Sequence, residues 1–144
     1  MATRPPTLRS RPLTLIYEIP ISKTLKFWNG IKEGKIFTTK CKKCGKLFFP
    51  PVADCPTCLS SDPEWVELSN DAEIETFTQV LVLPATFQKY EPYIIGIARL
   101  KEGVRVLAWL KDVKRREDVK VGMKVKLLPK VSPEGMLTYE FLPI

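Results

Sequence analysis

Apolar and polar residues alternate through most of the second half of the chain, which is the pattern of β-strands. In residues 72–83 the predicted strand presents on one face Ile74, Thr76, Thr78, Val80 and Val82. Four more strands are predicted over residues 93–101, 104–111, 123–128 and 137–142. Glu102-Gly103 separates the second and third strands, and such a glycine-containing pair predicts a compact hairpin.

The last two strands are bounded by residues that end strands. Gly122 precedes residues 123–128, Pro129 follows them, and Pro133-Glu134-Gly135 precedes the final strand. Met123, Val125 and Leu127 are predicted to point inward, and the alternating apolar residues of the final strand are Leu137, Tyr139 and Phe141. No clear helix is expected in this half. Five short antiparallel strands whose edges need closure favour a small barrel of the OB type over residues 71–144, with an SH3-like barrel as the nearest alternative.

The first half has a different organisation. Residues 22–36 predict a short amphipathic helix, with Ser22 as its N-cap and Gly34 as its C-terminal stop. Its apolar stripe consists of Leu25, Trp28 and Ile31. We expect either that Trp28 packs on the chain's own neighbouring module or that this stripe docks another protein.

Residues 1–21 form a basic, proline-rich tail before the helix. Residues 1–12 contain three arginines and three prolines and little that could pack, so we expect a mobile or partner-wrapped segment. Residues 13–21 are apolar enough to pack, although Pro20 prevents a continuous helix.

Four cysteines supply the strongest chemical signal in the sequence. Cys41 and Cys44 form one Cys-x-x-Cys turn and Cys55 and Cys58 a second, with ten residues between the pairs. Two such turns in one short hairpin converge on a tetrahedral metal site, which predicts a zinc ribbon over residues 37–70. Gly45 suits the left-handed conformation that often follows such a turn. Zinc is the expected ion, and iron, which rubredoxin binds, is the alternative. The competing interpretation of the four cysteines is that they form two disulfides or are four unrelated thiols.

The composition of the chain limits the cellular compartments and the kinds of partner that are expected. No apolar run reaches the roughly 18 residues that a transmembrane helix needs, and no signal-peptide core follows the first arginines, so we expect a cytoplasmic protein without a membrane partner. The formal net charge is +7. A zinc tetrathiolate adds about −2 by ionic counting, which leaves an excess of positive charge that favours anionic partners or forms a solvated basic face.

Autonomous catalysis is not expected. The sequence has no histidine, which removes the commonest general base. The four cysteines are assigned to the metal, and a four-thiolate site leaves no open position for an activated water. The metal is therefore expected to be structural.

Further segments carry a resemblance to a known family. They are Phe27-Trp28, Glu33-Gly34-Lys35, Cys41-x-x-Cys44-Gly45, Phe49-Pro50-Pro51, Cys55-Pro56-x-Cys58 with Trp65, Pro92-Tyr93-Ile94, Leu100-Lys101-Glu102-Gly103, Val121-Gly122-Met123-Lys124-Val125 and Phe141-Leu142-Pro143. Over about residues 22–144 the chain resembles the acyl-CoA-associated OB-fold proteins with an N-terminal rubredoxin-like zinc ribbon, formerly a domain of unknown function. It departs from their pattern at Leu59, where a glycine is usual, so we expect a less regular second turn.

The resemblance implies a mainly β protein with a helix, a zinc ribbon and a five-stranded OB barrel in that order. It also implies a non-catalytic accessory protein that docks on a thiolase-like condensing enzyme and positions an acyl-CoA thioester in lipid, isoprenoid or polyketide-type metabolism. The candidate docking residues are Leu25, Trp28 and Ile31. The candidate acyl-CoA-binding residues are Phe87, Tyr90, Tyr93, Arg99, Arg105, Trp109 and Lys111.

A single-stranded nucleic-acid-binding protein is the alternative function, because OB barrels bind both kinds of ligand. We disfavour it, since the outward strand positions are mostly lysines without interleaved aromatic residues and a base-stacking platform is not evident. Electron transfer through an iron centre is a third and weaker alternative.

Overall fold

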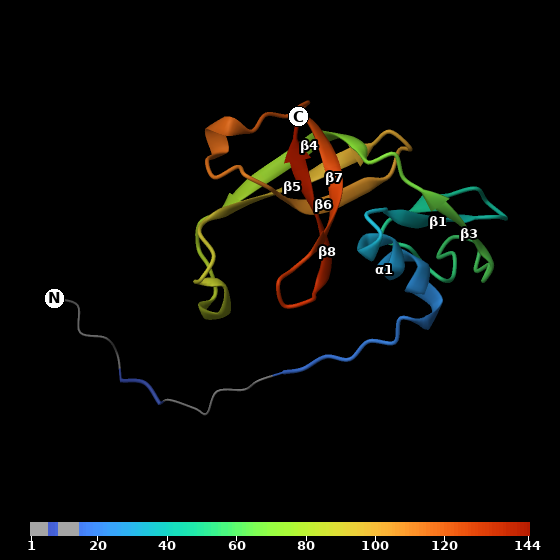
Figure 1. The fold of residues 1–144 in the computed structure, drawn as a ribbon, viewed down its shortest axis with the longest axis horizontal. Coiled ribbons are helices and arrows are strands. Elements are labelled where there is room, and N and C mark those ends of the chain that lie inside the picture. The colour runs from blue at the N-terminus through green and yellow to red at the C-terminus, as the bar shows by residue number, and fades with distance from the viewer. Residues whose placement is uncertain (1–5, 9–14) are drawn as a thin grey trace.

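The computed structural model describes residues 6–8 and 15–144 of the chain. Residues 1–5 and 9–14 lie outside the described part, so most of the expected mobile or partner-wrapped segment 1–12 is not described. Figure 1 shows a five-stranded barrel beside a smaller module formed by one helix and a three-stranded sheet. The fold is mainly β, as the sequence predicts.

The helical and ribbon elements come first. A 3-10 turn, Ser22–Thr24, leads into helix α1, Leu25–Lys32, and the three ribbon strands are β1 (Phe37–Cys41), β2 (Leu47–Phe48) and β3 (Pro63–Glu67). Gly34 has a φ of 80° just after the helix and ends it as expected. The prediction of Ser22 as N-cap is wrong, because Ser22 lies within the 3-10 turn and no side chain caps either helical segment. Among the described residues, none of these helices is both long and apolar enough to cross a bilayer.

The barrel strands follow the predicted segments closely. They are β4 (Asp71–Val80), β5 (Tyr93–Leu100), β6 (Arg105–Leu110), β7 (Lys124–Val131) and β8 (Leu137–Pro143). Around the barrel they lie in the order β4-β5-β6-β8-β7, with β6 and β8 parallel and the other pairs antiparallel. This five-stranded closure is the OB fold, in which each strand has two neighbours along at least part of its length.

One face of β4 differs from the alternation that the sequence predicts. Ile74 pairs with Ala98 while Thr76 pairs with Ile97, so Glu75 is an extra residue in a β-bulge. The bulge reverses the faces: Ile74 points into the core, whereas Thr76 and Thr78 are exposed. The expectation that these three residues share a face is therefore wrong, because an inserted residue shifts a period of two by one position.

Strand β7 also runs further than predicted. Pro129 lies inside it, opposite Tyr139, and pairing continues to Val131 opposite Leu137. Strand β4 pairs with β7 only at residues 124–126, so beyond that point β7 has a partner strand on one side only. A proline without an N–H is tolerated on such a one-sided stretch, and Pro129 does not end the strand.

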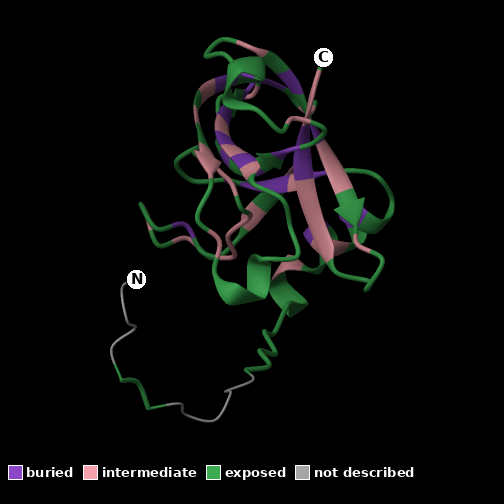
Figure 2. Ribbon diagram, turned by 90° about the vertical axis from the view of Figure 1, so that its left-hand side faces the viewer, coloured by how far each residue is buried: buried purple, intermediate pink, exposed green. Residues whose placement is uncertain are grey.

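An aromatic cluster joins the two modules. The ring centroid of Phe27 in α1 lies 6.0 Å from that of Phe49 in the ribbon and 6.3 Å from that of Tyr139 in β8, and Phe49 and Tyr139 are 5.3 Å apart. All three pairs meet edge to face, an arrangement that stabilises aromatic pairs beyond their buried area. Figure 2 shows the buried residues concentrated inside the barrel and where the helix meets it. The helix, the ribbon and the barrel thus share one apolar core.

Candidate functional site

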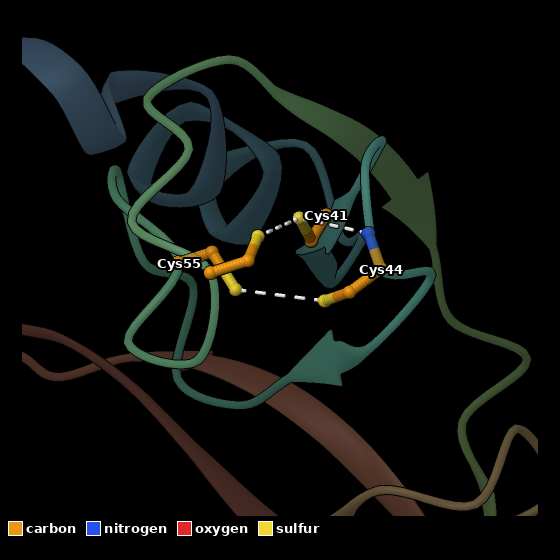
Figure 3. A group of neighbouring side chains, drawn as sticks. Cys41, Cys44 and Cys55 are labelled. Carbon is orange, nitrogen blue, oxygen red and sulfur yellow. Dashed lines mark hydrogen bonds between the residues drawn. The ribbon is translucent and has the colours of Figure 1, made fainter.

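The four cysteines meet at one point between two matching turns. Figure 3 shows their side chains converging, with the Sγ atoms of Cys41 and Cys58 separated by 3.4 Å and those of Cys44 and Cys55 by 3.6 Å. All four Sγ atoms lie within 4.8 Å of one another, and none forms a disulfide. The competing interpretation as two disulfides is therefore excluded for this structure.

These distances fit a metal ion. A Zn–S bond of about 2.3 Å places tetrahedral sulfur atoms about 3.8 Å apart, which lies within the observed range. The backbone N–H of Cys44 points at the Cys41 sulfur, 3.4 Å away. This hydrogen bond is the largest of several that together lower the pKa of the Cys41 thiol to about 6. A lowered pKa favours the thiolate that zinc or iron binds. The four residues complete a tetrathiolate site with no position for a reacting water.

The second turn repeats the backbone of the first despite Leu59. The N–H of Gly45 donates to the carbonyl of Cys41 and that of Leu59 to the carbonyl of Cys55, each over 2.9 Å. Gly45 has a φ of 71° and Leu59 a φ of 57°. The expectation of a less regular second turn is wrong: the hydrogen bonds hold a leucine in the left-handed conformation, which costs roughly 1–2 kcal/mol.

A groove of about 630 Å³ lies on the barrel, between two loops and strand β6. Phe87 and Tyr90 line it from the β4–β5 loop, Trp109 and Leu107 from β6, and Met136 from the β7–β8 loop. In OB barrels the second and third strands, together with these two loops, form the surface at which ligands bind. We call this site the aromatic groove.

The aromatic candidates from the sequence meet here. The ring centroids of Phe87 and Tyr90 lie 5.7 Å apart, Tyr90 meets Trp109 edge to face at 5.7 Å, and Trp109 stacks on Tyr93 at 3.8 Å. Tyr93 does not line the groove but supports Trp109. The strand pattern did not show a stacking platform, and the β4–β5 loop adds two aromatic residues, Phe87 and Tyr90, beside Trp109.

A buried carboxylate borders the same groove. Glu140 in β8 is bracketed by Lys130, whose Nζ is 2.7 Å from one carboxylate oxygen, and by Lys111, whose Nζ is 3.8 Å from the other. The sequence pointed to Lys111 but not to Glu140 or Lys130. The sequence did contain a signal for this pair: Glu140 lies between Tyr139 and Phe141 in an apolar strand. An acidic residue buried there requires a cationic partner, which could have been sought among the lysines.

The two arginine candidates lie elsewhere. Arg99 and Arg105 occupy the other end of β5 and β6, where they donate to the two carboxylate oxygens of Glu75 over 2.5 and 2.6 Å. The hydrogen bond from Arg105, followed by that from Arg99, lowers the pKa of Glu75. The β-bulge puts Glu75 between the two arginines. A second hollow of about 590 Å³ near them is lined by Glu73, Glu75 and Lys124, whose charges pair with one another or with Arg99.

The three docking candidates differ in exposure. Ile31 is 2% exposed and packs in the shared core, so it is not available to a partner, whereas Leu25 is 47% exposed. Trp28 is half-buried; it packs against the core, and its indole N–H donates to the Thr24 hydroxyl over 3.3 Å. The helix stripe therefore mostly serves the fold, and docking through Leu25 and Trp28 stays a prediction.

Comparison with family models matches both modules. Residues 28–64 match the rubredoxin-like zinc ribbon domain of ChsH2, and residues 65–128 match its C-terminal OB-fold domain. These matches agree with the metal site and the barrel described above.

Known proteins resemble the whole chain or its parts. A DUF35 domain-containing scaffold protein of Methanocaldococcus jannaschii is 34% identical over 128 residues, which cover 83% of this chain and 90% of that protein. The benzoylsuccinyl-CoA thiolase subunit BbsA of Thauera aromatica is 35% identical over 71 residues, or 49% of this chain and 48% of BbsA. The solved Ltp2-ChsH2(DUF35) aldolase contains a chain with the same fold (TM-score 0.69, 23% identity, covering 92% of this chain and 98% of that one).

Replacing one metal ligand tests the site. We expect Cys44→Ser to reduce the bound metal from about one ion per chain to almost none and to unfold the ribbon, because structural zinc supplies folding free energy directly. Metal analysis and thermal melting measure both effects. The exposed neighbour Lys43→Ser leaves the four thiolates in place and is the control. Full metal content and an unchanged melting curve in Cys44→Ser would contradict the site.

Relieving the strained leucine tests the second turn. We expect Leu59→Gly to raise the free energy of unfolding by about 0.5–1 kcal/mol, since the gain of an unstrained left-handed backbone exceeds the entropy cost of glycine. Leu59 is 83% exposed, so little packing is lost. Leu59→Ala, which keeps the strain, is the matched control and should change stability by less than about 0.5 kcal/mol. Denaturant unfolding of the metal-loaded protein distinguishes the two; a Leu59→Gly variant no more stable than Leu59→Ala would refute the argument.

Proposed function

This chain belongs to the DUF35 family of zinc-ribbon and OB-fold proteins, and we propose that it is a non-catalytic accessory subunit of a thiolase-like condensing enzyme. In this proposal the aromatic groove holds the thioester arm of an acyl-CoA for the partner. The function is positioning: a held thioester has a high effective concentration beside the partner's active site and is kept from water.

The names of the relatives support the partnership. Proteins similar to this chain over most of its length are named scaffold proteins, and BbsA, similar over half of it, is named a thiolase subunit. A scaffold or subunit needs a surface for its partner and no chemistry of its own.

The chemistry of the described side chains supports a non-catalytic role. The sequence has no histidine, and the four cysteines surround one point. Two carboxylates beside the hollows are held by cations, Glu75 by two arginines and Glu140 by two lysines. A carboxylate held in this way is a poor general base, because proton uptake would break its ion pairs.

The aromatic groove is the observation on which the acyl-CoA proposal rests. Its volume of about 630 Å³ is in the range of small-molecule sites. Phe87, Tyr90, Trp109 and Met136 offer apolar surface to a pantetheine or acyl arm. Lys89 and Lys130 line the same groove, where Lys89 lies 3.9 Å from Glu134 and Lys130 pairs with Glu140. Lys111, the second lysine on Glu140, adds a positive charge that no further carboxylate among the described residues balances and that is available to a phosphate. Arg99 and Arg105 have no part in this version of the site, because they lie at the other end of β5 and β6 from Trp109.

The aromatic groove also supports a second candidate function, binding of single-stranded nucleic acid. Bases stack on exposed aromatic rings while lysines follow the phosphates, and the string from Phe87 to Trp109 offers such rings. We favour acyl-CoA because of the thiolase subunit among the relatives. The two ligands differ in salt dependence, since an oligonucleotide displaces several counterions per chain.

Calorimetric titration with acetyl-CoA and with a short single-stranded oligonucleotide, each at several salt concentrations, tests the proposal. We expect acetyl-CoA to bind, and Trp109→Ala and Tyr90→Ala each to weaken binding by about tenfold, because an aromatic contact is worth 1–3 kcal/mol. Tyr90 lies in a loop, so its removal leaves the barrel strands intact. Arg105→Gln, outside the groove, is the control and should change affinity by less than about twofold.

The results separate the two candidates. Steeply salt-dependent oligonucleotide binding, with no binding of acetyl-CoA or of a thiolase-like enzyme, would establish the second candidate. Loss of acetyl-CoA binding in Arg105→Gln but not in Tyr90→Ala would place the ligand at the arginines instead.

A further inference from the structure

An extended apolar segment precedes the helix and has no partner strand among the described residues. Residues 15–21, which we call the N-terminal arm, contain five large apolar residues, and most of each of their side chains except that of Ile21 is exposed. Figure 1 shows the arm leaving α1 and running outside the ribbon and the barrel, and Figure 2 shows it exposed. Contiguous exposed apolar surface of this kind marks an interaction site.

The order of residues in the arm gives it two unlike sides. In an extended chain alternate residues share a side, so Leu15, Tyr17, Ile19 and Ile21 lie together. Ile16, Glu18 and Pro20 lie on the opposite side, which is partly polar. Seven extended residues span about 23 Å, long enough to fill several adjacent side-chain pockets.

The arm has no evident acceptor in its own chain. The barrel is closed, and its one-sided stretches are short: for example, β4 after Ile74 pairs only with β5, and β7 after Lys126 pairs only with β8. In the ribbon sheet, one edge strand, β2, has two residues, and the other, β3, begins with a proline and has five. Among the described residues, the arm pairs with none of these edges.

Charge favours a different protein over a second copy. The chain has a formal net charge of +7, and the residues before the arm include Arg4, Arg9 and Arg11 but no acidic residue. Two copies would bring like charges together, whereas an apolar groove rimmed by acidic groups would complement both the arm and the arginines.

We infer that the N-terminal arm binds in extended form in an apolar, acid-rimmed groove of the thiolase-like partner, with Leu15, Tyr17, Ile19 and Ile21 facing the partner and Ile16 and Glu18 facing away. This inference rests on the proposed function and adds to it the segment that docks. Because the arm does not pack on its own chain, it is free to be ordered by the partner, as an extended peptide is in a groove.

Two isoleucines of the arm provide a matched test. Ile19 is 77% exposed and Ile16 is 86% exposed, so neither replacement by serine should affect folding. We expect Ile19→Ser and Tyr17→Ser each to weaken binding to the partner by about tenfold or more, because each removes a large apolar group from the buried side. Ile16→Ser should change the affinity by less than about twofold. Melting curves and metal content should match those of the unsubstituted protein in all three variants.

The measurement uses the full chain and each tagged thiolase-like protein of the source organism, with dissociation constants from biolayer interferometry and masses from light scattering. If the intact chain binds an enzyme and Ile19→Ser binds equally well, the inference fails and the proposed function stands. Equal losses of affinity in Ile16→Ser and Ile19→Ser would overturn the inference that the arm binds in extended form with one side facing the partner. A dimer of the chain alone that Ile19→Ser dissociates would assign the arm to a second copy. If no thiolase-like protein binds the intact chain, both the inference and the proposed partnership fail.

Discussion

The contact among Phe27, Phe49 and Tyr139 connects the helix, the ribbon and the barrel. Each ring comes from a different unit, and Tyr139 also lines the aromatic groove. The metal fixes the ribbon that presents Phe49, so metal binding and the shape of the groove are linked through one aromatic ring. A ribbon of three short strands has too little apolar area to hold this geometry alone, which explains why a structural ion is required there.

Much of the fold follows from local pattern. The alternation along β5, β6 and β7, the turn at Gly103 and the Cys-x-x-Cys pairs each determine a structure within a few residues, and the sequence predicted them. The bulge at Glu75 could not be predicted, because it depends on which residues of β5 lie opposite. The continuation of β7 through Pro129 was missed for a related reason: it depends on where β4 stops pairing, which is a property of the closed barrel.

The candidate site shows the same division. The metal ligands are recognised by spacing alone, and the aromatic residues by their type and their place in one loop and its flanking strands. The arginines were grouped with them because Arg99 and Arg105 flank the same hairpin, yet strand length places them at the far end from Trp109. Lys111 was identified as a cation, but its carboxylate partner, Glu140, comes from a strand distant in sequence. Pairing between distant strands therefore limited the prediction of the groove more than residue chemistry did.

Closure of the barrel also bears on how the protein meets its partners. Each barrel strand has two neighbours along part of its length, and stretches such as those of β4 after Ile74 and of β7 after Lys126 have a partner strand on one side. In our proposal, recognition falls to the aromatic groove, to the exposed part of the helix and to the N-terminal arm. The groove is bordered by ion pairs that hold its charges in place, while the arm is apolar and unpaired. A rigid site suits a small ligand that must be held in one orientation, and an extended arm gains contact area on a protein surface without deforming that site.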